Sequence, residues 1–294
     1  MDELRPLLFS IAYRMLGSVG DAEDVVQEAL LRYDQAEGVE SPKAWLTSVV
    51  TRLAIDQLRS ARARRETYVG EWLPEPLVNG DDDPAAHAEQ ADTLSMAFLL
   101  LLERLTPVER AVFLLHDVFA YRYDEIADLI GRSEANCRQL GVRARRHVEA
   151  EKPRFEASRH ERDELAARFF AAVQDGDVDE LVGMLAADAV VVGDGGGKAP
   201  QWATPIVGPE RIAKLLAGTG MQMRRHGMRL ERRHVNGQPG AVLRMANGDV
   251  AVVWTVEIAD GAVQALRSVI NPDKLRHLGP VADLRALLRA ERGR

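Results

Sequence analysis

The sequence Tyr123–Arg146, YDEIADLIGRSEANCRQLGVRARR, decides how the N-terminal half of this chain folds. A short helical run ends at Gly131, and Ser133 follows as a residue that favours the N-cap of the next helix. That next helix is rich in arginine. A helix, a turn with glycine and a capped basic helix are typical of a helix-turn-helix. We therefore expect this stretch to place one helix in the major groove of DNA.

Helical periodicity extends on both sides of this stretch. Residues 1 to about 65 carry apolar side chains at helical spacing throughout, interrupted at Gly17–Gly20. Asp21 is expected to cap the second helix, and Pro42 to stand at the first turn of a long third helix. The N-terminal half is therefore predicted to be all-α.

The pattern changes twice farther along the chain. Proline, glycine and aspartate between residues 66 and 90 exclude a regular helix or a central strand, so this segment is a linker with a solvated acidic tip at Asp81–Asp83. After about residue 156 come two helices, a strand, a loop, a short helix and further strands. Asn247-Gly248 and Asp260-Gly261 are strong hairpin signals between apolar runs. The C-terminal part is predicted to be an α+β domain with a curved sheet around helices.

Composition excludes several classes of protein. The 294 residues carry a net charge of −7, which argues against a uniformly basic nucleic-acid coat but not against a local basic face. One cysteine, Cys137, cannot form an intramolecular disulfide or a cysteine-pair metal site. No apolar run approaches the roughly 18 residues of a membrane span, and no secretory signal opens the chain. We expect a cytoplasmic protein without a membrane partner.

Several motifs, in this order, resemble those of bacterial RNA polymerase sigma factors of the extracytoplasmic-function (ECF) type. Asp21–Glu28 (DAEDVVQE) is similar to the core-binding signature of sigma region 2, and Arg52–Arg59 (RLAIDQLR) resembles its promoter-melting helix. Leu105–Arg110 (LTPVER) and Tyr123–Ala127 (YDEIA) are similar to region 4. The resemblance implies binding to core RNA polymerase, through its beta-prime clamp and beta flap, and to the −10 and −35 promoter elements.

By this resemblance an acidic helix face meets the polymerase clamp. Carboxylates accept charge-assisted hydrogen bonds from arginines, and glutamine adds a donor and an acceptor. The residues expected on this face are Asp21, Glu23, Asp24, Gln27 and Glu28. A solvated helix face is the alternative interpretation of the same pattern.

The resemblance also implies two sets of DNA-binding residues. For the −10 element they are Ser41, Lys43, Trp45, Arg52, Asp56 and Arg59, with Trp45 left open between base contact and core packing. For the −35 element they are Arg122, Ser133, Asn136, Arg138, Gln139, Val142, Arg143 and Arg145. Arginine can bind guanine and glutamine can bind adenine through two hydrogen bonds, whereas other arginines contact phosphate.

The C-terminal part resembles the SnoaL-like, ketosteroid-isomerase-like (NTF2-like) cone fold. Three motifs, Trp72–Pro76 (WLPEP), Asp194–Lys198 (DGGGK) and Asn271–Leu275 (NPDKL), are similar to those of the ECF41 subgroup, which includes sigma-J-like proteins with a fused SnoaL-like extension. The resemblance implies that this domain regulates in cis by packing against the linker and both sigma modules. The residues expected at that interface are Trp72, Pro74, Asp194, Gly195, Gly196, Gly197, Lys198, Asn271, Pro272, Asp273, Lys274 and Leu275.

Enzymatic chemistry is the main alternative for the C-terminal domain. Gly197-Lys198 is no phosphate-binding loop, because Val192 and Ala199 stand where that motif needs glycine and serine or threonine. The acid–base candidates are Asp188, Asp194, His226, His234 and Asp249, and none lies in a catalytic motif. We expect no catalytic residue, metal or cofactor.

The sequence thus predicts four segments: region 2 (1–66), a linker with the WLPEP motif (67–92), region 4 (93–152) and a SnoaL-like regulatory domain (156–294). The expected function is an alternative sigma factor, regulated in cis and without need of a separate anti-sigma factor. Two alternatives remain. One is a SnoaL-like enzyme or small-molecule sensor with an accessory DNA-binding module, and the other is an ordinary regulator that uses its helix-turn-helix alone.

Overall fold

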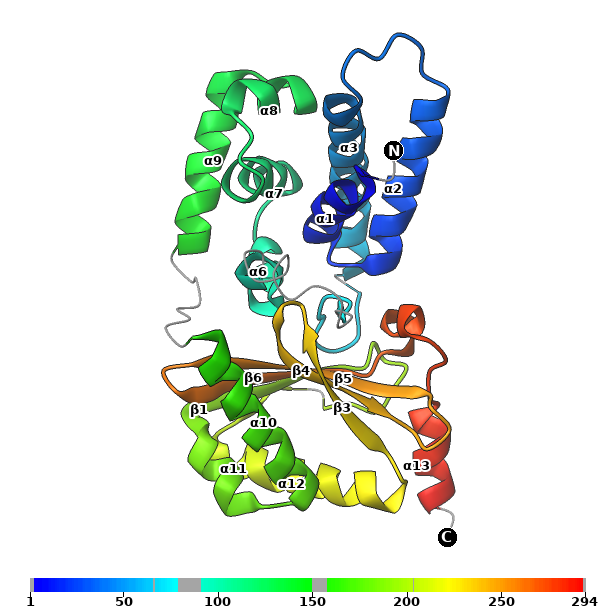
Figure 1. Ribbon diagram of the computed structural model, residues 1–294, viewed down its shortest axis with the longest axis vertical. Helices are drawn as coiled ribbons and strands as arrows, with labels where there is room; N and C mark the ends of the chain where they lie inside the picture. Colours follow the sequence, from blue (N-terminus) through cyan, green and yellow to red (C-terminus); the bar gives the residue numbers. More distant parts are fainter. Residues whose placement is uncertain (1–2, 66, 79–90, 150–157, 203, 293–294) are drawn as a thin grey trace. The chain divides into compact units, whose positions relative to one another are not determined.

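The computed structural model describes residues 3–65, 67–78, 91–149, 158–202 and 204–292 (Figure 1). Their helices and strands divide into two units. Unit 1 combines residues 1–67 with 97–153, and unit 2 combines residues 68–96 with 154–294. Residues 68–96, which join the two helical modules along the chain, therefore belong to unit 2. We call them the joining segment.

Unit 1 is helical because its apolar side chains recur at helical spacing, which lets each helix bury one face. Its helices are α1 (Arg5–Leu16), α2 (Val19–Asp34), α3 (Pro42–Arg65), α6 (Met96–Leu102), α7 (Pro107–Phe113), α8 (Tyr123–Ile130) and α9 (Glu134–Glu149), with a π-helical turn at Leu114–Val118. The expectation that Asp21 caps α2 is wrong. Ser18 is the N-cap, and its Oγ accepts from the Asp21 backbone N at 3.1 Å, so α2 begins at Val19.

The helix-turn-helix is confirmed. Gly131 ends α8 in the left-handed region, with φ of +67°. Ser133 caps α9 by accepting from the Asn136 backbone N at 3.3 Å, and Cys137 is buried on its inner face. These caps fix where α9 starts and so which of its side chains face solvent.

Unit 2 is an α+β layer structure. Its six strands are β1 (Leu185–Asp194), β2 (Ile206–Val207), β3 (Arg229–Val235), β4 (Gln238–Arg244), β5 (Val250–Ala259) and β6 (Ala262–Val269), in the sheet order β2-β1-β6-β5-β4-β3. All neighbours are antiparallel except β1 and β6, which run parallel. Both predicted hairpin turns are present, at Asn247-Gly248 and Asp260-Gly261.

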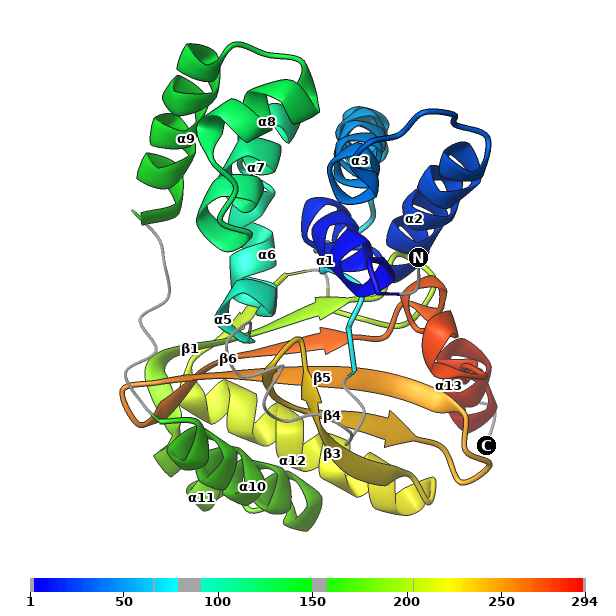
Figure 2. The same cartoon turned by 45° about the horizontal axis from the view of Figure 1, so that its top comes forward.

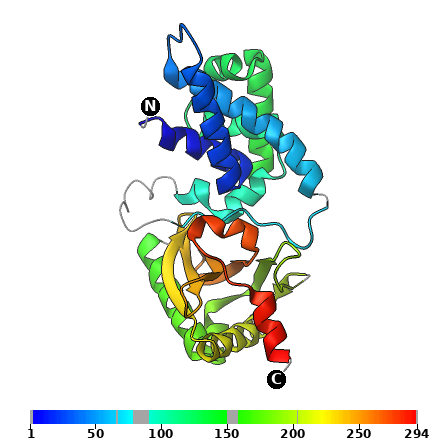
Figure 3. The same ribbon diagram turned by 90° about the vertical axis from the view of Figure 1, so that its right-hand side faces the viewer.

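Three helices pack on one face of this sheet (Figures 1 and 2). They are α10 (Arg159–Asp175), α11 (Val178–Met184) and α12 (Pro209–Arg225), and α12 is not the short helix that the sequence suggested. Two short helices complete unit 2: α5 (Ala91–Leu94) and the C-terminal α13 (Leu284–Arg292), which is red in Figure 3.

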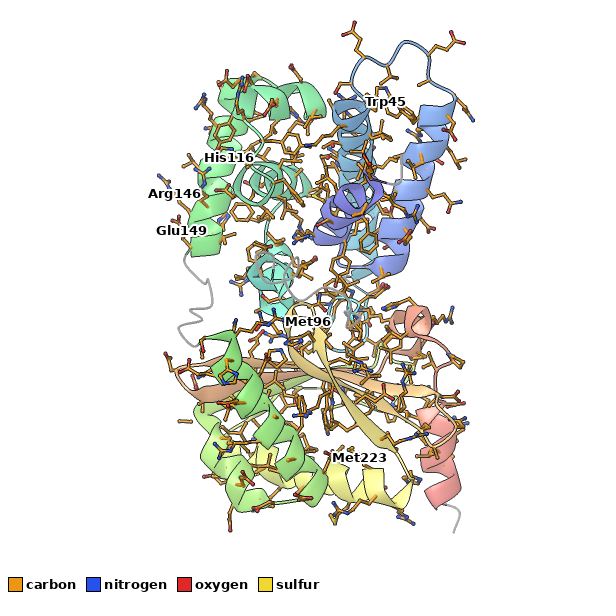
Figure 4. The ribbon with its side chains drawn as sticks, in the orientation of Figure 1. Trp45, Met96, His116, Arg146, Glu149 and Met223 are labelled. Carbon is orange, nitrogen blue, oxygen red and sulfur yellow. The ribbon has the colours of Figure 1, made fainter. Side chains whose placement is uncertain are left out.

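The core of unit 2 lies between these helices and the sheet. The ring of Phe170 on α10 stacks on Trp254 of β5 with centroids 6.4 Å apart, and Met223 of α12, labelled in Figure 4, is buried in the same cluster. The backbones of α10 and α12 approach closely at Gly220. A Cβ there would stand 2.0 Å from the carbonyl oxygen of Val173.

This close approach gives a matched pair of substitutions in one helix. Gly220→Ala should destabilise unit 2 by about 1–3 kcal/mol, because the added methyl group forces α10 and α12 apart. Gly218→Ala, with open space at its Cβ, should instead stabilise by about 0.4–1 kcal/mol. Urea unfolding followed by circular dichroism measures both. Equal effects of the two substitutions would contradict the packing described here.

Candidate functional site

The acidic residues predicted to bind polymerase lie along α2. Its inner face, with Ala22, Val25, Val26 and Ala29, is buried. On the outside, Asp24 and Gln27 are exposed. Glu23 pairs with Arg5, and Glu28 accepts from Arg32 Nε at 2.7 Å. Exposed ion pairs of this kind contribute little to stability, so these carboxylates can exchange partners at small cost.

Of the residues predicted to read the −10 element, Ser41, Trp45 and Arg52 line one cavity of unit 1, whereas Lys43, Asp56 and Arg59 do not. The cavity has a volume of about 770 Å³ and is lined by the loop Glu37–Ser41 together with Trp45, Arg52 and Leu129. Trp45, labelled in Figure 4, is half-buried and meets Tyr33 edge to face at 5.7 Å between ring centroids. One side of the indole is thus fixed by packing while the residue also lines the cavity.

Arg52 is held by the helix-turn-helix module. Its Nε donates to the Leu129 carbonyl oxygen at 2.9 Å, and Ser48 Oγ donates to the same oxygen at 2.7 Å. The last carbonyls of a helix lack partners within it, so α3 caps the carboxyl end of α8. Farther along α3, Asp56 and Arg59 form an exposed pair at 3.1 Å. Near its start, Lys43 lies over the Tyr121 ring, 5.9 Å from the centroid.

The residues predicted to read the −35 element are mostly exposed along α9. Gln139, Val142 and Arg143 face solvent, as does Arg138 with its guanidinium over the Tyr123 ring. The others are more constrained: Arg122 pairs with Asp124, Asn136 is half-buried, and Arg145 is held by Asp117 at 2.6 Å and by the Tyr123 hydroxyl at 2.9 Å. The bond to Asp117 raises the pKa of Arg145.

The WLPEP segment is bound within unit 2 by one buried carboxylate. Asp194, at the end of β1, is 0% exposed. Its Oδ1 accepts from the Tyr68 hydroxyl at 2.5 Å, and its Oδ2 accepts from the Leu73 backbone N at 2.9 Å and from Lys274 Nζ at 2.6 Å. Burial and the bond to Asp194 raise the pKa of Tyr68, so the phenol stays protonated and donates.

Lys274 completes this arrangement. Its ammonium group also donates to the Leu73 carbonyl oxygen and lies 4.4 Å from the centroid of the Trp72 ring, a cation–π distance. Asn271 Nδ2 donates to the Tyr68 hydroxyl oxygen at 2.8 Å. We name Tyr68, Leu73, Asp194, Asn271 and Lys274 the linker-binding cluster.

The glycines of the DGGGK motif allow this close approach. Gly196 and Gly197 have φ of +55° and +66°, and a Cβ at Gly196 would stand 2.2 Å from Asn271 Nδ2. A Cβ at Gly197 would press on Val69 at 3.1 Å. Lys198 pairs with Asp273 at the surface. Of the other predicted interface residues, Pro74, Gly195 and Leu275 are buried, and Pro272 opens the turn that carries Lys274.

A second contact to the joining segment escaped the sequence analysis. Asn236 is 0% exposed, accepts from the Leu77 backbone N at 3.0 Å and donates to the Leu94 carbonyl oxygen at 3.1 Å. The neighbouring His277 Nε2 lies 2.8 Å from the Pro76 carbonyl oxygen. Asn236-Gly237 is itself a hairpin dipeptide, and this signal could have located both β3 and the turn. The acidic tip at residues 81–83 lies outside the described residues.

The acid–base candidates do not gather in one place. Asp194 belongs to the linker-binding cluster, His234 Nε2 lies 3.0 Å from Asp163 Oδ1, and Asp249 accepts from Asn247 within a hairpin turn. Asp188 is exposed, and His226 lines a cavity. Among the described residues, no three His, Cys, Asp or Glu side chains could together hold a metal ion. Within the same residues, no helix is long and apolar enough to span a membrane.

Three family models match the chain. Sigma-70 region 2 matches residues 1–64, Sigma-70 region 4 matches residues 95–148, and the SnoaL-like domain matches residues 166–270. The matches follow the chain order of the two helical modules and the α+β domain.

Proteins of known identity resemble the chain over most of its length. The chain is 41% identical over 287 residues to the ECF RNA polymerase sigma factor SigJ of Mycobacterium tuberculosis. This alignment covers 93% of the present chain and 91% of SigJ. The chain is 32% identical over 279 residues to the probable ECF RNA polymerase sigma factor SigI of the same species, with 92% of each covered. The crystal structure of M. tuberculosis SigJ aligns with a TM-score of 0.72 and 38% identity, over 93% of this chain and 96% of that one.

A double-mutant cycle measures the coupling between Asp194 and Lys274 in the linker-binding cluster. Asp194→Asn and Lys274→Met should each destabilise unit 2 by about 3–5 kcal/mol, because each leaves an uncompensated buried charge. The double variant should cost less than the sum of the two. Lys198→Met removes a partner from an exposed pair and should cost less than about 1 kcal/mol. Urea unfolding measures all four, and additive effects of the two cluster substitutions would contradict a buried ion pair.

Proposed function

Since this chain belongs to the ECF RNA polymerase sigma factors, we propose how its own residues carry out promoter recognition and its regulation. A protein of this family directs transcription initiation by RNA polymerase, and the SnoaL-like domain acts in cis because it is part of the same chain.

Core polymerase binds through the exposed side of α2. Asp24 and Gln27 meet the partner first because they are exposed. Asp21 adds a carboxylate at the start of the helix, and Glu23 and Glu28 add carboxylates whose exposed arginine partners are easily exchanged. The beta-prime clamp is the polymerase surface proposed for this face, and the beta flap is proposed for the second module. No separate anti-sigma factor enters the scheme.

The −10 element is read beside α3. The cavity next to Trp45 is of a size to admit an extruded base, with Ser41 and Lys43 at the loop and Arg52 and Arg59 for the backbone. Arg52 is exposed and caps α8 through its Nε, so N–H groups of its guanidinium that do not bond to α8 can still donate to a phosphate.

The −35 element is read by the exposed side of α9. Gln139 and Arg143 carry the donors and acceptors that distinguish bases, and Val142, with 45% of its surface exposed, can contact a thymine methyl group. Arg122, Arg145 and Arg146 contact phosphate and set the position of the helix.

Regulation in cis acts through the joining segment. The observation that carries this proposal is the buried Asp194 carboxylate, which binds the segment at Tyr68 and Leu73 while Lys274 neutralises it. Asn236 holds the same segment again at Leu77 and Leu94. Because the segment connects regions 2 and 4, its attachment to the SnoaL-like unit limits the separation of the two modules, and so whether −10 and −35 can be bound together.

Run-off transcription tests the regulatory proposal. The assay compares the full chain, a chain that stops at Pro153, and the Asp194→Asn and Lys198→Met variants, each with purified core polymerase at equal protein amounts. Truncation and Asp194→Asn should change the transcript yield by roughly fivefold or more, with an unchanged start site. Lys198→Met should transcribe like wild type. Wild-type yield from Asp194→Asn would refute regulation through the cluster.

Two substitutions on α9 separate base reading from phosphate contact. Gln139→Ala should weaken binding by about 1–3 kcal/mol and relax the preference at one base pair of the −35 element. Arg146→Ala, exposed at the end of the helix and labelled in Figure 4, should weaken binding to all sequences alike and reduce its salt dependence. Holoenzyme binding to a set of single-base promoter variants measures both. A sequence-selective effect of Arg146→Ala, or a uniform one of Gln139→Ala, would contradict the assignment.

A further inference from the structure

Tyr123, the first residue of α8, lies against α9 within a network of aromatic and charged side chains. Its half-buried ring stacks on His116 of the π-helical turn, with ring centroids 4.1 Å apart, and His116 is labelled in Figure 4. His116 Nδ1 donates to the Tyr121 carbonyl oxygen at 2.8 Å, which fixes the imidazole ring. The Tyr123 hydroxyl oxygen accepts from Arg145 Nη2 at 2.9 Å. The phenol is therefore held both at its face and at its hydroxyl group.

A glycine inside α9 makes room for this ring. Gly141 is buried in the middle of the helix, where glycine is less favourable than alanine because it loses more conformational freedom on folding. A Cβ at this position would stand 2.5 Å from the Tyr123 hydroxyl oxygen and 3.1 Å from Cε1 of the same ring. Since the ring is stacked and hydrogen-bonded, a side chain at position 141 can be accommodated only by displacing it.

The same ring also contacts the guanidinium group of Arg138 on α9. This group lies over the Tyr123 ring, 5.2 Å from its centroid, which is a cation–π distance. Arg138 Nε donates to Glu134 Oε1 at 3.1 Å, and Arg138 Nη2 donates to the same oxygen. Within the described residues Nη1 has no hydrogen-bond partner, and Nη2 keeps a second hydrogen. The end of the guanidinium formed by Nη1 and Nη2 can therefore bind a partner outside the chain.

This free end of Arg138 suits guanine. Two N–H groups of an arginine match the O6 and N7 acceptors of guanine in the major groove. A long side chain that becomes ordered only on binding loses conformational freedom, which lowers affinity by about two- to tenfold. Because Tyr123 and Glu134 already order the guanidinium group, less of this freedom remains to be lost when DNA binds.

We propose that Tyr123 is a positioning residue for promoter reading, which holds Arg138 in place to bind one guanine of the −35 element, and that Gly141 is glycine so that the ring can reach this place. The inference rests on the proposed function, in which α9 reads the −35 element. Tyr123 acts through Arg138 and not on a base. Loss of the ring should therefore weaken the preference at one base pair more than the affinity for all sequences.

Holoenzyme binding to single-base variants of the −35 element tests this role, with the folding of each protein variant checked by circular dichroism. Arg138→Ala identifies the base pair that Arg138 reads, where wild type should prefer guanine by about fivefold or more. Tyr123→Leu should reduce this preference by about threefold or more. Tyr123→Phe keeps the ring and should stay within about twofold of wild type. So should the control Tyr121→Phe, which removes a hydroxyl group that contacts Thr47 instead.

Gly141→Ala tests the same fit from the side of α9. The added methyl group should displace the ring and reduce the preference by about threefold or more, as Tyr123→Leu does. Tyr123→Phe in the Gly141→Ala background removes the oxygen that lies closest to this methyl group, so the preference should return to within about twofold of wild type. A merely structural role of the ring would instead lower the affinity for all sequences alike.

An unchanged preference in folded Tyr123→Leu, or an equal loss in Tyr123→Phe, would overturn the positioning role. If Tyr123→Leu does not fold, Gly141→Ala and its rescue decide the question, and a loss without rescue would overturn the role. If Gln139→Ala changes a base preference and Arg138→Ala changes none, the inference fails while the proposed function stands. If neither substitution changes any preference, reading of the −35 element by α9 itself fails.

Discussion

A charged pair buried at the end of one strand sets the rest of this architecture. Asp194 and Lys274 are both withdrawn from water, and each must replace its hydration by hydrogen bonds within the protein. The chain supplies these bonds largely from the joining segment, through the Tyr68 hydroxyl and the backbone of Leu73 within WLPEP. The pair is therefore satisfied only when the joining segment is in place. Because the buried pair needs hydrogen bonds from the joining segment, it fixes the position of that segment. Its net contribution to the free energy of unfolding is the smaller effect.

The same principle operates in unit 1. The last carbonyl groups of α8 have no partner within the helix, and α3 supplies Ser48 and Arg52 to the Leu129 oxygen. Arg52 is also one of the side chains proposed for promoter DNA. In both places, side chains from another part of the chain bond polar groups that would otherwise be left unpaired.

Much of the fold could be predicted from the sequence because local signals agreed with the tertiary structure. Ser133, Gly131 and two hairpin dipeptides placed their elements correctly, and the motifs at residues 194–198 and 271–275 pointed to the segments that meet the linker.

Other features depend on distant partners. The parallel pairing of β1 with β6 joins strands far apart in the chain, and Tyr68 acts only because Asp194 and Asn271 come to it. Asn236 was missed although its Asn-Gly dipeptide was visible. The misplaced cap at Asp21 arose because Ser18 competes for the same role three residues earlier.

The central claim is that Asp194 fixes the joining segment in the full chain. Hydrogen–deuterium exchange, followed by mass spectrometry of peptides covering residues 68–78, tests it directly. The account predicts that the amides of Leu73 and Leu77, which donate to buried side chains, are protected in the wild-type chain. Leu73 should lose this protection in Asp194→Asn, whereas Leu77, held by Asn236, should keep most of it. Exchange of the wild-type segment at the rate of an unfolded peptide would contradict the account.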